Sequence, residues 1–280
     1  MAKLIQYCTK ASTFDGEFQW QAAGMGYVLV SDSGGLLVID GGHGGDAEGI
    51  LALLEGNSAV KPAVDLWIIT HPHGDHYFAL EAIADTPELS KRVDVRRVCY
   101  AVPEQFSWMW RGKLCNGQGD LDRLNAIAPK LGAEVLTPKT DERIEIGGFT
   151  LDFLFTWSDT TDWSSPNALS LIFTVTGGKR RAMFVGDTDE KVPGELINRM
   201  GDDFSRLKCD ILQVAHHGLD GGSREFYAAV GADIVLVPIS YAGARDMRLP
   251  DRTCCRHNRW AEEQAMTVIR ACTGTAEVEL

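Results

Sequence analysis

Short runs of apolar residues, separated by polar or glycine-containing turns, recur along the whole chain. Runs rich in Val, Ile, Leu and Phe are typical of buried β-strands, whereas apolar residues spaced three or four positions apart are typical of helices. On this basis we expect strands at residues 24–30, 35–39, 64–70, 93–102, 134–136, 143–146, 149–155, 168–175, 182–185, 210–214 and 234–237. We expect helices at residues 46–54, 77–84, 121–131, 193–200, 223–230 and 259–272.

The expected elements form two strand-rich blocks, and each block ends in alternating helices and strands. This order predicts a mixed α/β (α+β) fold. No repeat, low-complexity tract or charge block interrupts the chain, so we expect a single domain over residues 1–280. Polar residues follow several strands directly, and loops at one sheet edge commonly carry functional groups because the strands fix their positions.

The strand expected at residues 64–70 leads directly into the sequence HPHGDH. His71 and His73 alternate in an extended segment, so both side chains can face the same side. Asp75 and His76 follow where the next helix is expected to begin. Four such side chains at one strand end suit a divalent metal ion. The alternative, a polar loop with coincidental histidines, is disfavoured because three of the chain's seven histidines lie here.

Three further strands end in side chains of the same chemical kind, namely Asp40, Asp187 and His216. Each is weak evidence alone, because Asp-Gly sequences such as Asp40-Gly41 also form ordinary turns. Beside a metal loop, however, a carboxylate that orients the histidines is expected, and Asp40 is the candidate.

Composition limits the class of protein and its partners. The formal net charge of -12 disfavours a general nucleic-acid-binding surface, which needs a basic face. Seven cysteines without a C-x-x-C pair favour reduced thiols and a cytoplasmic location. No signal-peptide pattern or membrane-length apolar run is present, so we expect a protein without membrane spans. The oligomeric state stays open.

The H-x-H-x-D-H sequence, followed in order by Gly186-Asp187 and His216-His217-Gly218, resembles the metallo-β-lactamase superfamily over about residues 20–240. The resemblance implies a four-layered αβ/βα sandwich with a metal pair at one edge. It implies that His71 and His73 bind the first metal ion. The second ion would be bound by Asp75, His76 and His216, and Asp187 would bridge the two ions. Asp40 would orient the loop. Imidazole and carboxylate ligands suit zinc, in one or two ions, with manganese or iron as alternatives.

One feature departs from the common pattern of that superfamily. A further histidine ligand is expected before the bridging aspartate, yet no histidine lies between His76 and His216. Asn167 lies near the expected place, in an Asn-x-x-Ser sequence that resembles the soluble metallo-hydrolase domain of bacterial DNA-uptake competence proteins. Asn167 is therefore a candidate for ligating the first metal, binding its water or contacting substrate. Capping a turn is the equal alternative.

Several other side chains have two interpretations. Arg245 and Arg248 are candidates for binding an anionic substrate, although a solvated basic loop explains them as well. His217 is a candidate proton donor or a structural partner in its turn. The cluster of Trp108 and Trp110 either lines a pocket or packs an insertion, and packing is the simpler account.

These observations predict a metal-dependent hydrolase that uses an activated water on a phosphodiester or ester-like small substrate. Because the metal centre is cationic, an anionic substrate is the expectation. Asp75 would hold or accept a proton. The alternative is a non-catalytic metal-binding sensor or interaction protein that retains the fold. Metal analysis with a substrate panel separates the two.

Overall fold

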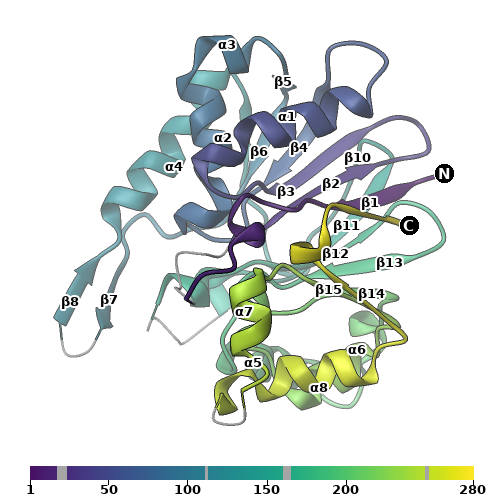
Figure 1. Ribbon diagram of the computed structural model, residues 1–280. Helices are drawn as coiled ribbons and strands as arrows, with labels where there is room; N and C mark the ends of the chain where they lie inside the picture. Colours follow the sequence, from purple (N-terminus) through teal and green to yellow (C-terminus); the bar gives the residue numbers. More distant parts are fainter. Residues whose placement is uncertain (18–23, 111–112, 160–164, 250–251) are drawn as a thin grey trace.

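The computed structural model describes residues 1–17, 24–110, 113–159, 165–249 and 252–280. Its strands form two large sheets and a hairpin (Figure 1). The first sheet has the order β17-β1-β2-β3-β4-β6-β9, with β5 paired to β4. Its strands are β1 (Lys3–Gln6), β2 (Gly26–Val30), β3 (Leu36–Asp40), β4 (Ala63–Ile68), β5 (Asp94–Val95), β6 (Arg97–Cys99), β9 (Glu134–Leu136) and β17 (Ala276–Glu279).

The second sheet runs in the order β10-β11-β12-β13-β14-β15-β16. Its strands are β10 (Arg143–Ile146), β11 (Phe149–Phe155), β12 (Ile172–Thr176), β13 (Arg181–Phe184), β14 (Ile211–Gln213), β15 (Ile234–Val237) and β16 (Thr267–Arg270). The hairpin consists of β7 (Ser107–Trp110) and β8 (Lys113–Asn116). The helices are α1 (Ala47–Gly56), α2 (Gly74–Asp85), α3 (Pro87–Ser90), α4 (Gln118–Leu131), α5 (Lys191–Met200), α6 (Arg224–Val230), α7 (Tyr241–Asp246) and α8 (Arg256–Gln264).

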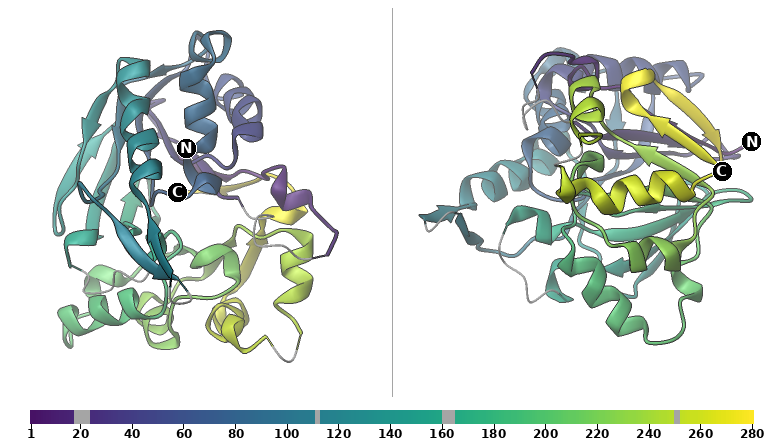
Figure 2. Two further views of the ribbon diagram at one scale, coloured as in Figure 1. Left: turned by 90° about the vertical axis from the view of Figure 1, so that its left-hand side faces the viewer. Right: turned by 60° about the horizontal axis from the view of Figure 1, so that its bottom comes forward.

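The core has three apolar layers, which make the fold a four-layered αβ/βα sandwich. Inward-facing residues of both sheets, such as Leu37 and Phe173, pack against one another in the middle layer. A second layer joins the first sheet to α1, α2 and α4, and a third joins the second sheet to α5, α6 and α8. Figure 2 shows this order from another side, with the helices of the two halves on opposite sides of the strands. The predicted fold class is confirmed, because alternating strand residues bury one face against each neighbouring layer.

Several predicted elements differ from the structure, and the strand expected at residues 93–102 is divided into β5 and β6. The helix expected at residues 259–272 is wrong in its second half, because α8 ends at Gln264 and Thr267–Arg270 forms β16 beside β15. The β-branched residues Val268 and Ile269 suit this strand. The strand expected at residues 168–175 begins only at Ile172, after a 3₁₀ turn.

The sequence interpretation missed the terminal strands. β1 pairs with β2 on one side and with β17 on the other, so the two chain ends lie next to each other (Figure 1). Among the described residues, no helix is both long and apolar enough to cross a membrane.

Strand direction brings the functional loops to one edge. β3 and β4 are parallel in the first sheet, and β13 and β14 are parallel in the second. The loops that follow these four strands carry the predicted metal-site residues. The amide of Leu171 donates a 3.0 Å hydrogen bond to the carbonyl of Thr70, which links the two sheets at this edge.

Candidate metal centre

The HPHGDH sequence forms the end of a buried strand and the start of a helix. β4 is flanked by β3 and β6, and His71 follows it at 1% exposure. α2 begins at Gly74, earlier than the sequence predicts, so Asp75 and His76 lie in its first turn. His73 directly precedes the helix in extended conformation. The chain direction therefore changes within this loop and turns all four side chains toward the second sheet.

Two groups of metal-ligand side chains share one carboxylate. The first group contains His71, His73 and Asp187, and the second group contains Asp75, His76, Asp187 and His217. Within each group, one ligand atom from every residue lies within 4.8 Å of the others. The shared member, Asp187, is 2% exposed. Because Asp187 belongs to both groups, the arrangement can hold two cations side by side.

The atoms of the first group lie close together. His71 Nε2 lies 2.9 Å from His73 Nδ1 and 3.7 Å from Asp187 Oδ2. Burial lowers the pKa of His71 well below its ordinary value, and His76 adds to this effect. Burial also lowers the pKa of His73. Both imidazoles are therefore neutral at pH 7, which is the form that binds a metal ion.

The second group is tighter and carries charge. His217 Nε2 lies 3.1 Å from Asp75 Oδ2 and 3.3 Å from Asp187 Oδ2, and His76 Nε2 lies 3.3 Å from the same Asp187 oxygen. Burial acts to raise the pKa of Asp75, but His76 and His217 outweigh it and hold that pKa well below its ordinary value. Burial acts to lower the pKa of His217, but Asp187 and Asp75 raise it to about 10.

Buried atoms without hydrogen-bond partners indicate that a cation fits here. His76 Nε2, His217 Nε2 and Asp187 Oδ1 are buried and have no hydrogen-bond partner among the described residues. Buried polar atoms are normally satisfied, because leaving one unpaired costs about 1–3 kcal/mol. The two imidazole nitrogens face carboxylate oxygens of the second group at 3.1 to 3.3 Å without a hydrogen bond, and a divalent cation bound among them would satisfy these nitrogens. The cluster and its chemistry imply divalent metal ions, with zinc, manganese or iron compatible with the donors.

The positions of His216 and His217 differ from the prediction. We expected His216 in the second group and His217 as a proton donor, whereas the structure places His217 in the second group. His217 Nδ1 lies 3.0 Å from the carbonyl oxygen of Pro238, so both of its ring nitrogens face acceptors. The cause is the backbone, because both histidines have positive φ angles, 46° and 55°, and turn sharply after β14.

Asp40 lies where a carboxylate that orients the loop is expected. It is fully buried, and its Oδ1 atom accepts a 2.8 Å hydrogen bond from the amide of Thr70. Its Oδ2 atom lies 2.9 Å from His76 Nδ1 and 2.9 Å from the hydroxyl of Thr70. This fixes His76 with Nε2 toward Asp187, an arrangement common among metal-binding histidines.

Sequence reasoning missed three supporting side chains. Thr70 links Asp40 to the histidine loop, and Asp220 forms an ion pair with His216 Nδ1. Gln213 is fully buried and accepts hydrogen bonds from the amides of Val185 and Gly186, at 2.8 and 2.9 Å. Thr70 and Asp220 have no distinctive spacing, and Gln213 lies within an apolar strand. Only the position of Thr70 next to His71 offered a signal.

Asn167 reaches the cluster from a short 3₁₀ turn, Pro166–Leu169. Its Nδ2 atom lies 3.5 Å from His216 Nε2, and its Oδ1 atom is buried without a hydrogen-bond partner. Ser170, three positions later, accepts a 3.1 Å hydrogen bond from the amide of Asp187. The Asn-x-x-Ser sequence thus contacts the loop after β14 through Asn167 and the loop that carries Asp187 through Ser170.

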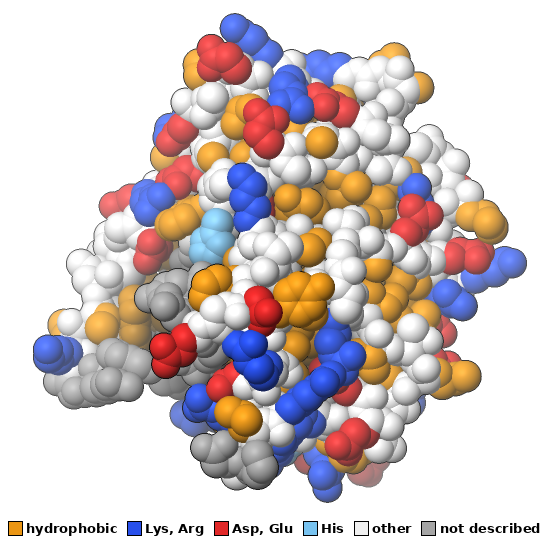
Figure 3. Space-filling model, in the orientation of Figure 1, with side chains coloured by type: hydrophobic (Ala, Val, Ile, Leu, Met, Phe, Trp, Pro, Cys, Tyr) orange, Lys and Arg blue, Asp and Glu red, His pale blue; other side chains and the backbone are white. Residues whose placement is uncertain are grey.

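Arg245 and Arg248, the two arginines predicted to bind substrate, contact residues near them and neither metal-ligand group. Arg245 donates hydrogen bonds to the Asp15 carboxylate at 2.7 Å and the Gly16 carbonyl at 2.6 Å. Arg248 lines a separate hollow beside Glu262 and Glu263. Within the described residues, no hydrogen bond or ion pair joins either arginine to the two groups. Figure 3 shows Lys and Arg side chains gathered over α7 and α8 with carboxylates among them, which agrees with a solvated surface.

The aromatic insertion packs beside the cluster. Phe106 stacks on Trp108 with ring centroids 5.4 Å apart, and it packs with Leu121 and Leu169. Leu169 belongs to the turn that carries Asn167. The side chain of Trp110 lies outside the described residues. Packing is therefore the observed role of Phe106 and Trp108.

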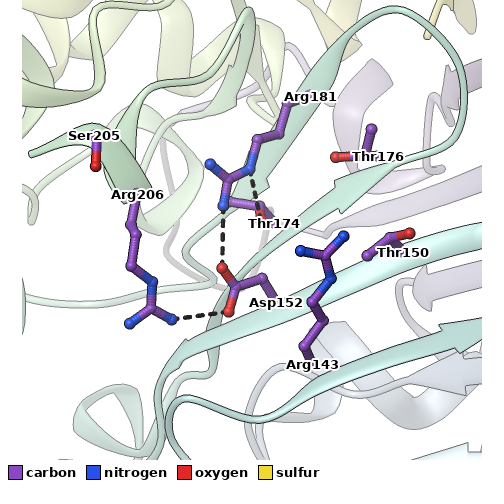
Figure 4. Close-up of a pocket in the computed structure, with 8 residues that line it drawn as sticks. All are labelled: Arg143, Thr150, Asp152, Thr174, Thr176, Arg181, Ser205 and Arg206. Atoms are coloured by element: carbon purple, nitrogen blue, oxygen red, sulfur yellow. Dashed lines mark hydrogen bonds and ion pairs between the residues drawn. The ribbon is translucent and has the colours of Figure 1, made fainter.

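A hollow of about 360 Å³ lies apart from the histidines, on the outer face of β10–β13 (Figure 4). Arg181 and Arg206 both point to Asp152, at 3.3 and 2.9 Å, while Arg143 stands beside them. Threonines from β11 and β12, together with Ser205, complete the lining. Since no residue of either metal group lines it, this hollow is distinct from the candidate centre.

A family model of the metallo-beta-lactamase superfamily matches residues 24–237. The chain belongs to this superfamily. No curated protein matches it significantly.

Solved structures share the metallo-beta-lactamase fold over nearly the whole chain. The metallo-beta-lactamase fold protein YhfI from Bacillus subtilis is 15% identical to this chain. The comparison covers 99% of this chain and 100% of that chain, with a TM-score of 0.55. A diphosphatase of the PhnP family is 15% identical, with 100% and 98% covered and a TM-score of 0.53. Tm1679, a metal-dependent hydrolase of the beta-lactamase superfamily, is 12% identical, with 99% of each chain covered and a TM-score of 0.56. At these identities the likeness establishes the fold.

Proposed function

We propose that the protein is a metal-dependent hydrolase that cleaves a phosphodiester or related ester bond in a small, anionic substrate. The observation that carries this proposal is the carboxylate of Asp187, which belongs to both ligand groups at one edge of the sheets. A divalent metal pair bound there, with zinc as the first choice, would supply Lewis acidity and a water of lowered pKa.

The protein's own side chains would divide the work. His71 and His73 would hold the first cation, and Asp75, His76 and His217 the second, with Asp187 between them. The Asp75 side chain is 21% exposed and faces His217, so it can also hold a proton during the reaction. Asp40 would keep His76 in the correct orientation.

The substrate class rests on local charge and on resemblance. A divalent metal pair outweighs the charges of Asp75, Asp187 and Asp40 together, so the centre would attract an anion despite the net charge of -12. Asn167 lies beside the centre and can donate a hydrogen bond to such a group. The likeness of the Asn-x-x-Ser and His-His-Gly sequences to competence proteins, and the diphosphatase among the solved neighbours, favour a phosphodiester.

The second candidate is a non-catalytic metal-binding protein. A purely structural metal is usually closed off by four ligands. Here Asp75 and His216 retain 21% and 20% side-chain exposure, so the centre is open to solvent. This opening favours the enzyme over the structural metal.

The deciding experiment loads the protein with zinc or manganese and measures turnover of bis(4-nitrophenyl) phosphate, 4-nitrophenyl phosphate, 4-nitrophenyl acetate and a lactone. We expect turnover of the phosphodiester, abolished by chelation and by His73→Ala, with the far-UV circular dichroism unchanged. His257→Gln is the control, because His257 pairs with Glu190 outside the centre. Full metal occupancy without turnover of any compound would instead support the non-catalytic role.

A further inference from the structure

The first group has fewer side chains than the second. It contains three residues, His71, His73 and Asp187, whereas the second contains four. Protein-bound zinc usually takes three or four protein ligands, and the one carboxylate here is shared between two positions. A fourth ligand beside the first group would give the two metal positions the same number of protein ligands.

His216 lies beside the carboxylate that the two groups share, outside both groups as the mutual distance of 4.8 Å defines them. Its Nε2 atom is 3.7 Å from Asp187 Oδ2, the same distance as His71 Nε2 from that oxygen. The two second-group histidines approach the oxygen more closely, at 3.3 Å. Asn167 faces the same nitrogen at 3.5 Å. His216 therefore lies as far from Asp187 Oδ2 as His71 of the first group does, and farther than either histidine of the second group.

Asp220 holds the other nitrogen of the same ring. The Asp220 carboxylate pairs with His216 Nδ1, which leaves Nε2, beside Asp187 and Asn167, as the nitrogen that a metal ion would bind. Asp40 does the same for His76, and the Pro238 carbonyl does so for His217. A carboxylate or carbonyl on the outer nitrogen is the arrangement that usually orients a metal-binding imidazole.

The backbone turns two neighbouring rings toward one carboxylate. Adjacent side chains in a strand or helix face different directions. Here His216 and His217 both adopt the left-handed conformation, which costs roughly 1–2 kcal/mol per residue. The His216 amide is anchored to the Gly186 carbonyl at 3.1 Å, next to Asp187. Such strain persists where the surrounding structure and a function maintain it.

We propose that the two adjacent histidines divide between the two groups, so that His216 supplies the third imidazole of the first and His217 completes the second. This assignment rests on the proposed two-metal function. It also explains how the chain dispenses with a histidine between His76 and His216. The Asp220–His216 pair becomes part of the metal centre.

The test counts bound zinc by elemental analysis after dialysis at limiting zinc, with cobalt(II) absorption spectra as a second readout of ligand environment. The variants are His71→Gln, His216→Gln, His217→Gln and the double variants of the first with each of the others. We expect His216→Gln to weaken the same zinc equivalent as His71→Gln, by about 10–100-fold or more. The pair His71→Gln/His216→Gln should keep the second equivalent, whereas His71→Gln/His217→Gln should lose both.

Two results would overturn the assignment: a His216→Gln protein that binds both equivalents as tightly as the wild type, or a His71→Gln/His216→Gln protein that loses both. A wild-type protein that takes up fewer than two equivalents would instead contradict the two-metal function itself. If His216→Gln does not fold, Asp220→Asn should weaken the same equivalent, and His257→Gln serves as the matched control.

Discussion

Asp40 holds His76 from the side away from the ligand groups: Asp40 Oδ2 lies 2.9 Å from His76 Nδ1, while His76 Nε2 lies 3.3 Å from Asp187 Oδ2. Asp40 is the last residue of β3 and has a positive φ of 55°. Its peptide carbonyl also accepts a 2.7 Å hydrogen bond from the indole of Trp67. The last residue of β3 thus fixes His76, a candidate ligand on α2, the helix that follows the neighbouring strand β4.

Asp40→Asn should weaken metal binding without unfolding the protein. The amide cannot supply two acceptor oxygens, so Thr70 and His76 would compete for one. Loss of such an orienting partner typically lowers metal affinity or activity 10–100-fold. Titration with zinc against a chromophoric chelator measures the change.

The matched control is Asp46→Asn. Asp46 is equally buried, but its carboxylate accepts hydrogen bonds from the amides of Lys10 and His43, outside both ligand groups. The orienting role of Asp40 would be contradicted if Asp40→Asn bound zinc as tightly as the wild type. It would also be contradicted if Asp46→Asn lost as much zinc affinity as Asp40→Asn.

Strand exits are the part of the centre that the sequence predicts well. An apolar run that stops at a charged residue marks both the strand and the side chain at its end, as at Asp40 and at Asp187. Parallel strands then bring such exits to one edge. The fold class follows from the same alternation of apolar and polar positions.

Other features depend on contacts that no local pattern encodes. β16 reads as a continuation of the preceding helix until its pairing with β15 is known. The second group contains His217 instead of the predicted His216. This difference depends on two positive φ angles, which are set by the surrounding turn rather than by residue type. Asp220 and Gln213 become relevant only because the folded chain brings them to the loops after β14 and β13.

Metal binding should release protons. Burial opposes the charged form of His76, but Asp187, Asp40 and Asp75 outweigh it and raise the pKa of His76 well above its ordinary value. The pKa of His217 is raised to about 10. Both histidines therefore carry protons at pH 7 in the metal-free protein, and a cation must displace them. We expect at least two protons released per metal pair. Burial opposes the charged form of His216, but Asp187 and Asp220 raise its pKa, so a metal ion bound to His216 would displace additional protons.

The sign of the pH dependence follows from these raised pKa values. The charged His217 stabilises the metal-free fold below its ordinary pKa of 6.5, and this contribution is lost as pH rises through about 10. Zinc affinity should therefore increase as pH rises toward about 10, because fewer protons remain on His217 for the cation to displace. Calorimetric titration at pH 7 in two buffers of different ionisation enthalpy counts the protons. Identical heats in both buffers would contradict the prediction.

Asp152→Asn should lower stability without affecting the metal centre. Its carboxylate pairs with both Arg181 and Arg206 in the hollow on the second sheet (Figure 4), and removing it leaves guanidinium groups facing one another. Because the Asp152 side chain is 21% exposed and the arginines more so, solvent screens the pairs. We expect a loss of about 1 kcal/mol in the free energy of unfolding.

Urea denaturation measures that loss. Asp202→Asn is the control, since Asp202 is exposed and makes no ion pair with any described residue. Equal stability of the two variants, or altered zinc binding in Asp152→Asn, would show that the arginine–aspartate group has another role.

Gln213→Leu should damage both the fold and the metal centre. Gln213 accepts hydrogen bonds from the amides of Val185 and Gly186, and its Nε2 atom donates to the Gly186 carbonyl at 3.0 Å. The leucine would leave the buried amides of Val185 and Gly186 unpaired, at roughly 1–3 kcal/mol for each amide that finds no water. The Gly186 carbonyl would keep its hydrogen bond from the His216 amide. Asp187 follows Gly186 directly, so its carboxylate would also lose its fixed position.

We therefore expect a lower free energy of unfolding together with weaker binding of both zinc equivalents, because Asp187 serves both groups. Gln6→Leu is the matched control: Gln6 is also buried, and its side chain donates a 3.1 Å hydrogen bond to the Ile269 carbonyl, away from the centre. Denaturation and zinc titration on the two variants separate the effects. If Gln213→Leu binds zinc as tightly as Gln6→Leu, the turn that carries Asp187 is held by its other contacts, among them the Ser170 hydroxyl.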